Sequence, residues 1–430
     1  MASPLEHYVN TVRTMSAAGN FRDLVEYLNE SVELLTRNIN ILDNVLETLD
    51  KQNHSLGFLY VIATKLNEIQ QNEDPEPILK LVKEFVTLCN GEQVRNAPQN
   101  YFDLFHNYTN LLVKRKLNTT QGIPILTIAI EKIQLMESQL TPLHADLCQL
   151  CLCSKIFKPA LHFLDIDITT IASSEEHQDA TTKYFLLYYY YGGMVYTAVK
   201  NYDRALYFFE VAISTPATAM SHIMLESYKK YILVSLILRG KQITIPKYSP
   251  QVITRFIKPL SQHYHELSNV YINNGSPDAV RSVMTKYQET FIRDNNMGLV
   301  KQVLSTLYKK KIQRLTKTFL TLSLSDVASR ASLSGPAEAE KYILNMIKSG
   351  EIFAVINQKD GMVIFHDDPE KYNTPNMYLK IQEDMNKVIE LNKKITKMEE
   401  KIMLTPMFVK KSTLPESAVD DKGYPSEACE

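Results

Sequence analysis

A histidine and three cysteines between residues 144 and 153 are the first candidates for chemistry, because imidazole and thiolate are preferred zinc ligands. His144, Cys148 and Cys151 would share one face of a helix, at spacings of four and then three residues. Cys153 would point away from that face, and structural zinc usually takes four ligands from turns. Half of the intervening residues, Leu147, Leu150 and Leu152, are leucine. The pattern therefore predicts a packed helix without a metal ion.

Two further motifs suggest catalysis at first sight. His263 and His265, followed by Asp278, resemble the zinc motif of JAMM isopeptidases. That motif requires a strand, whereas this segment has helical periodicity, which would separate the two rings by roughly 200°. Gly240-Lys241 lacks the upstream glycine of a phosphate-binding loop, and no Gly-x-Ser-x-Gly elbow occurs. We therefore predict no catalytic residues, no cofactor and no metal, and expect that the protein is not an enzyme.

A basic run lies between Met297 and Leu320, and no acidic residue interrupts it. Its members are Lys301, Lys309, Lys310, Lys311, Arg314 and Lys317. Such a run could contact nucleic acid, meet an acidic partner subunit, or form a solvated helix face. A later helix that would have to enter the DNA groove begins with Glu338 and Glu340, which would repel phosphates. Protein contact is therefore the preferred interpretation.

Composition bounds the class of protein. The chain has 430 residues, a formal net charge of −1, 45% hydrophobic residues and five cysteines. These values are typical of a globular protein of two or three domains without a disulfide framework. The N-terminus lacks the apolar core of a signal peptide, and the longest uncharged run, 184–199, is too short to span a membrane. We expect an intracellular protein with reduced thiols.

From Leu5 to about Val303, apolar residues recur at helical spacing between short polar breaks. Tyr189-x2-Gly192-Gly193-x2-Tyr196, followed by Ala205-x3-Phe209, follows the tetratricopeptide pattern, in which small residues let paired helices approach. Other copies are irregular in spacing. The sequence therefore predicts a degenerate helical-repeat solenoid, an architecture that exposes long binding surfaces.

The segment from Ser325 to Phe365 reads as two helices followed by a β-hairpin. Ser325 is expected to cap the first helix, Pro336 to open the second, and Asp360-Gly361 to form the hairpin turn. This order is typical of a winged helix. The hairpin is apolar on both faces, so a partner subunit or the chain's own C-terminal helix must cover one of them. The predicted interface residues of the wing are Ile352, Phe353, Val355, Met362, Ile364 and Phe365.

A helix of nearly thirty residues is expected from Asn376 to Leu404, with a disordered tail from about 406 to 430. A helix this long at a chain end usually needs a partner to cover its apolar stripe. The predicted interface residues of this helix are Ile381, Met385, Val388, Leu391, Ile395, Met398 and Ile402.

Helical repeats ending in a winged helix resemble the PCI domain, a module shared by the proteasome lid, the COP9 signalosome and translation initiation factor 3. Specific runs are similar to PCI subunits of the COP9 signalosome. These runs are 144–152, 188–194, 221–226, 293–301, 312–320, 350–354 and 356–363. The likeness covers most of the chain and is loosest in the first hundred residues and beyond Lys410.

The resemblance implies a mostly α fold with N-terminal repeats over 1–200 and a PCI domain over 201–366, whose winged helix starts near 299. It also implies a bundle-forming C-terminal helix over 367–405. In that complex, PCI subunits join through their winged helices and C-terminal helices, and a different subunit uses zinc to remove Nedd8 from cullins. The expected partners are other signalosome subunits, with subunits 1 and 8 as neighbours, and indirectly cullin-RING ligases, in cytoplasm and nucleus. The alternatives are a PCI subunit of the proteasome lid or initiation factor 3, and a winged-helix nucleic-acid binder.

Overall fold

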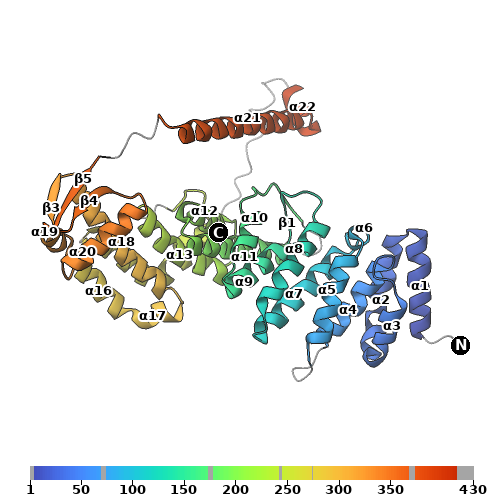
Figure 1. Ribbon diagram of the computed structural model, residues 1–430. Helices are drawn as coiled ribbons and strands as arrows, with labels where there is room; N and C mark the ends of the chain where they lie inside the picture. Colours follow the sequence, from blue (N-terminus) through green and yellow to red (C-terminus); the bar gives the residue numbers. More distant parts are fainter. Residues whose placement is uncertain are drawn as a thin grey trace. The chain divides into compact units, whose positions relative to one another are not determined.

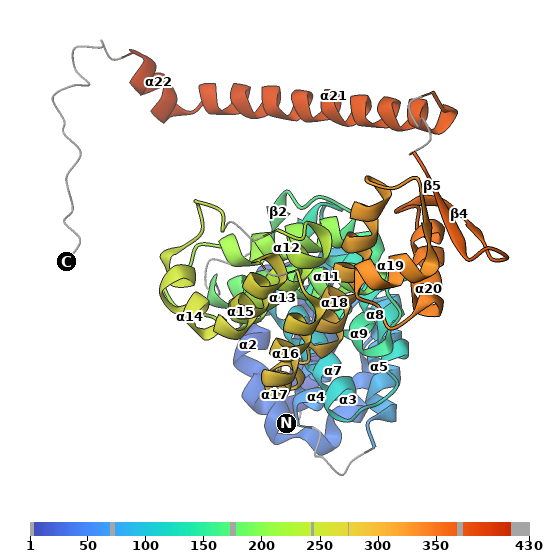
Figure 2. The same cartoon turned by 90° about the vertical axis from the view of Figure 1, so that its left-hand side faces the viewer.

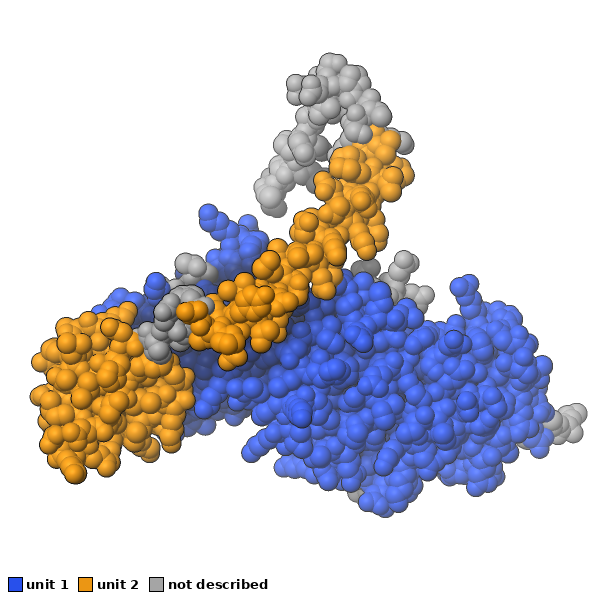
Figure 3. All heavy atoms as spheres, turned by 45° about the horizontal axis from the view of Figure 1, so that its top comes forward, with its two compact units in different colours: residues 1–311 blue, residues 312–430 orange. Residues whose placement is uncertain are grey.

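The fold is seen in a computed structural model, which describes residues 4–68, 74–172, 178–241, 245–273, 275–367 and 373–413. The chain divides into two compact units, residues 1–311 and 312–430 (Figure 3). The boundary falls inside helix α18 (Met297–Thr316), whereas the sequence predicted the winged helix to start near residue 299. Each unit has its own hydrophobic core.

The first unit is a succession of helices that pack against their neighbours in chain order (Figure 1). Its first half contains α1 (Pro4–Ala18), α2 (Phe21–Arg37), η1 (Ile39–Ile41), α3 (Leu42–Thr48), α4 (Ser55–Asn67), α5 (Glu76–Leu88), α6 (Gly91–Val94), α7 (Pro98–Lys114), η2 (Thr119–Gln121) and α8 (Gly122–Ile133). Its second half contains α9 (Leu143–Ser154), α10 (Lys158–Leu164), α11 (Gln178–Val199), α12 (Tyr202–Ser214), α13 (His222–Leu238), η4 (Ile253–Ile257), α14 (Lys258–Leu260), α15 (Gln262–Asn273), α16 (Pro277–Lys286) and α17 (Gln288–Arg293).

The pairing of α11 with α12 shows why these helices approach so closely. A Cβ added at Gly193 would lie 2.6 Å from Cε1 of Phe209, and one at Gly192 would lie 2.7 Å from Cε1 of Phe208. Both phenylalanines are buried on α12. The two glycines therefore leave the space that the aromatic rings fill, as the repeat pattern predicted.

Two very short strands interrupt the helices of the first unit. Strand β1 (Gln139–Leu140) pairs in parallel with β2 (Thr170–Ile171), and the Ala172 amide donates a hydrogen bond to the Leu140 carbonyl at 2.8 Å. The sequence had predicted no strand before the winged helix. Pairs of two residues carry no period that a sequence pattern could detect.

The second unit contains a winged helix with a three-stranded sheet. Its elements are β3 (Thr321–Ser323), α19 (Leu324–Ala331), α20 (Pro336–Lys348), β4 (Phe353–Asn357) and β5 (Met362–His366). Strand β5 is central, with β3 and β4 antiparallel on either side. The helices and hairpin occur in the predicted order, while β3 was not predicted.

Local backbone geometry explains the limits of these elements. The side chain of Ser323, and not that of Ser325, caps α19 by accepting a hydrogen bond from the Asp326 amide at 3.1 Å. Gly350 follows α20 with a φ of 69°, and Gly361 has a φ of 62° in the hairpin turn. Both conformations favour glycine, so these residues fix the end of α20 and the turn of the wing.

Helix α21 (Pro375–Met403) follows the wing and is a single long helix (Figure 2). The Thr374 side chain caps it by accepting a hydrogen bond from the Met377 amide at 3.3 Å. Helix α22 (Pro406–Thr413) comes next, so the predicted disorder from 406 is wrong for these eight residues. Residues 414–430 of the predicted tail lie outside the described residues.

Candidate protein-interaction surfaces

The cysteine-rich segment forms helix α9, whose His144, Cys148 and Cys151 are buried while Cys153 is exposed. His144 Nδ1 accepts a hydrogen bond from the Thr141 amide at 3.1 Å, and burial lowers the pKa of His144 to about 4. Burial also raises the pKa of the Cys151 thiol to about 11. These groups are therefore neutral near pH 7 and pack as core residues.

The three residues of the second histidine motif each contact a different neighbour. The His265 ring lies 3.1 Å from the Tyr228 hydroxyl, and the His263 ring packs on Tyr287 with centroids 4.4 Å apart. The carboxylate of Asp278 lies 3.4 Å from Arg281. Within the described ranges, no three His, Cys, Asp or Glu side chains gather in a way that could hold a metal ion.

A buried ionic cluster joins α13 to the segment between α17 and α18. Lys229 Nζ lies 2.7 Å from Glu226 Oε1 and 2.8 Å from Asp294 Oδ2. Burial alone would lower the pKa of Lys229, but its hydrogen bonds to both carboxylates outweigh burial and raise it. Tyr264 and Asn296 extend the network by hydrogen bonds of 2.9 Å each. Each of these side chains makes a hydrogen bond or an ion pair within the cluster. The cluster therefore positions the helices and offers no open binding site.

The basic run is not one continuous surface. Lys301, Arg314 and Lys317 are exposed, whereas Lys310 Nζ is buried and lies 5.8 Å from the centre of the Tyr271 ring. On α20, the Glu338 carboxylate accepts a hydrogen bond from the Ser334 amide at 2.9 Å. The helix that would enter a DNA groove thus begins with an ordered carboxylate, which disfavours phosphate binding.

The wing has an inner and an outer face. On the outer face, Val355 pairs with Ile364 across β4 and β5, and these side chains are 55% and 39% exposed. The predicted interface residues Phe353 and Met362 are half-buried. Ile352 and Phe365 were also predicted to be interface residues, but they lie in the unit's own core, each 4% exposed. This prediction is wrong for both, because they pack under the sheet against α19 and α20.

The seven residues predicted on the C-terminal helix are all exposed along α21. Their exposed fractions are Ile381 48%, Met385 59%, Val388 64%, Leu391 57%, Ile395 53%, Met398 60% and Ile402 57%. Sequence reasoning missed four further exposed apolar residues on this helix, which flank or extend the stripe: Tyr378, Leu379, Ile389 and Met403. For a monomer, one helix with this much exposed apolar surface marks an interaction site.

The apolar stripe turns around α21. With about 100° per residue, the stripe from Leu391 to Ile402 is centred about 80° away from the stripe of Ile381 to Val388. A single coiled-coil seam drifts by about 20° per heptad, and so by only about 35° over the roughly twelve residues between these two centres. The two halves of α21 therefore present their apolar faces in different directions, which suits contact with more than one neighbouring helix.

Among the described residues, no helix is both long enough and apolar enough to be a candidate membrane span.

A helical-repeat array followed by a winged helix is the architecture of a PCI-domain protein. Two family models match the chain: "COP9 signalosome complex subunit 3, N-terminal helical repeats" over residues 18–253 and "PCI domain" over residues 284–367. The chain is 56% identical over 426 residues to COP9 signalosome complex subunit 3 of Drosophila melanogaster, covering 96% of this chain and 95% of that protein. It is 37% identical over 394 residues to the Dictyostelium discoideum protein of the same name, covering 91% and 92%. The chain belongs to the COP9 signalosome complex subunit 3 family.

Proposed function

We propose that this chain is a non-catalytic scaffold subunit of the COP9 signalosome, the complex that removes Nedd8 from cullins of cullin-RING ligases. Its family membership supports other signalosome subunits as its partners. By resemblance, subunits 1 and 8 are its neighbours, and it acts in cytoplasm and nucleus. Its contribution to Nedd8 removal is to hold other subunits in place.

The observation that carries this proposal is the apolar stripe of α21. Eleven apolar side chains along this helix are about half exposed or more, namely the seven predicted and the four additional ones. At about 25 cal/mol per Å² of apolar surface, covering such a stripe would stabilise an assembly by several kcal/mol. Because the stripe changes direction along the helix, a bundle of several helices covers it better than one partner helix would.

The outer face of the wing is the second proposed contact. Val355 and Ile364 form a small apolar patch beside edge strand β4. An edge strand can pair with a strand of another subunit, and flanking apolar side chains add specificity. Phe353 and Met362, which are half-buried, lie at the margin of this contact.

The test is copurification from cells that express tagged variants. Asp at both Leu391 and Ile395 should abolish copurification of the other signalosome subunits, because two carboxylates would be buried in the bundle. Val355→Asp should weaken copurification in the same way.

A matched control places Asp at Asn386 and Lys393, on the opposite side of α21. This variant should copurify the complex at the wild-type level. Normal copurification by the Leu391/Ile395 double variant, with its helix content unchanged by circular dichroism, would show that α21 is not the assembly surface.

A further inference from the structure

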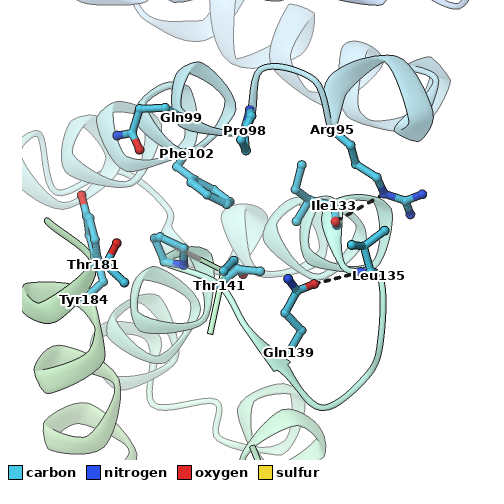
Figure 4. A pocket seen from close by; sticks show the side chains of 12 residues that line it. Arg95, Pro98, Gln99, Phe102, Ile133, Leu135, Gln139, Thr141, Thr181 and Tyr184 are labelled. Carbon is cyan, nitrogen blue, oxygen red and sulfur yellow. Dashed lines mark hydrogen bonds between the residues drawn. The ribbon is translucent and has the colours of Figure 1, made fainter. Parts of the chain in front are cut away.

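A cavity of about 220 Å³ opens on the first unit (Figure 4). Its walls come from the residue after α6, from α7, from the end of α8 with the following loop and β1, from Ala172, and from the start of α11. Its lining includes Arg95, Phe102, Ile133, Leu135 and Gln139.

The size and walls of the cavity suit one bulky side chain. Pockets for drug-sized ligands usually span about 300–1,000 Å³, so this cavity is too small for most of them. Phe102 and Ile133 give it an apolar interior. At its rim Leu135 is 69% exposed, and the adjacent Met136 is 55% exposed. These exposed side chains continue the apolar surface of the cavity onto the protein surface, where an approaching polypeptide can contact it.

The charge at the cavity is positive. Arg95 donates hydrogen bonds from Nε to the Ile133 carbonyl at 3.4 Å and from Nη2 to the Gln134 carbonyl at 3.0 Å. These bonds hold the guanidinium at the same end of the cavity as Leu135 (Figure 4). A guanidinium has five N–H donors, so others remain for a ligand. No aspartate or glutamate is among the described lining residues, and no carboxylate pairs with Arg95 in the described part of the chain.

Gln139 supplies a second donor at the rim. Its Oε1 accepts a hydrogen bond from the Leu135 amide at 3.0 Å, which directs the side-chain nitrogen away from that bond. The Gln139 backbone is already engaged, since its amide donates to the Met136 carbonyl and its carbonyl accepts from Gln134. A ligand therefore meets side-chain donors here and no free strand edge. Because these hydrogen-bond donors have no acidic partner, a ligand that supplies hydrogen-bond acceptors is expected to bind here.

We propose that this cavity docks an extended segment of a partner protein, which inserts one bulky apolar side chain and places a neighbouring carboxylate on Arg95. The apolar side chain fills the space between Phe102 and Ile133. The carboxylate binds the guanidinium that the end of α8 already holds in position, which lowers the ordering cost of binding.

The probe is the blocked hexapeptide Gly-Ser-Leu-Glu-Ser-Gly, titrated into the full chain with labelled methyl groups. Saturable shifts are expected at the Ile133 and Leu135 methyl resonances. Replacing the Glu of the peptide by Gln should weaken binding about tenfold through loss of the charge-assisted hydrogen bond. Replacing its Leu by Gly should remove the shifts at Ile133.

Variants of the chain separate docking from folding. Arg95→Gln should abolish the preference for Glu over Gln in the peptide, whereas Arg22→Gln, at an exposed arginine on α2, should preserve it. Because Arg95 also holds the end of α8, Leu135→Glu serves as a second variant, and it should repel the peptide without disturbing the fold. Equal binding of the Glu and Gln peptides, unchanged binding to Leu135→Glu, or no shift at Ile133 with any peptide would each overturn the proposal.

Discussion

His144 shows how a residue with catalytic potential becomes a core residue. It is 4% exposed, and its ring lies edge-on to Phe163 and Tyr188. Because burial lowers its pKa to about 4, the folded protein excludes a proton that an unfolded histidine binds below about pH 6.5. The neutral ring is part of the packing between α9, α10 and α11.

This shift makes stability depend on pH. The contribution of His144 is fully present above about pH 6.5 and is lost as the pH falls to about 4, a change of up to about 3 kcal/mol. His144→Asn should therefore flatten the fall in the free energy of unfolding over this range, as measured by urea denaturation. Asp146, whose pKa burial raises, has the opposite effect but is present in both proteins.

The control for this prediction is His162→Gln, since His162 is exposed. It should leave the pH profile unchanged. The prediction fails when the wild type and His144→Asn lose stability in parallel between pH 6.5 and 4.

At the scale of single residues, the sequence identifies the apolar side chains but does not always predict which of them are buried and which are exposed. Ile352 and Phe365 belong to a hairpin with apolar residues on both faces, so alternation could not separate core from surface. Only the packing of α19 and α20 decides which face is covered. The cavity beside Arg95 was not predicted, because its walls come from segments far apart in the sequence.

At the scale of elements, the close pair α11 and α12 depends on glycine. Gly193→Ala should lower the free energy of unfolding by about 1–3 kcal/mol, since its methyl group would overlap the ring of Phe209. Gly298→Ala, on α18, is the matched control: nothing lies within 4 Å of the added Cβ. There the helix propensity of alanine should stabilise the protein by up to about 1 kcal/mol. Opposite signs in urea denaturation would support this account, and a neutral Gly193→Ala would contradict it.

Long periodic elements were predictable, and short ones were not. Helix α21 was predicted to within one residue at each end, because its stripe repeats over many turns without Gly or Pro. Strand β3 has three residues and takes its structure from pairing with β5. The cap of α19 was misplaced by two residues because Ser323 and Ser325 are both suitable by type. Tertiary contacts select between such local alternatives.

At the scale of the whole molecule, the isolated chain should self-associate. The stripe of α21 has no cover among the described residues, and each half of it exposes large apolar side chains. Sedimentation velocity should show a mean mass that rises with protein concentration. A chain truncated before Pro375 should instead stay monomeric across the same concentrations, and a monomeric full-length chain would contradict the prediction.

The turning stripe of α21 also has a consequence for protein turnover. A copy of the chain without its partners exposes a helix that chaperones and degradation factors recognise by its apolar side chains. Assembly hides this signal, and a stripe that faces two directions is hidden completely only when every neighbour is present. The lifetime of the chain in a cell should thus follow the supply of its partners, so that surplus copies are removed and stoichiometry is maintained.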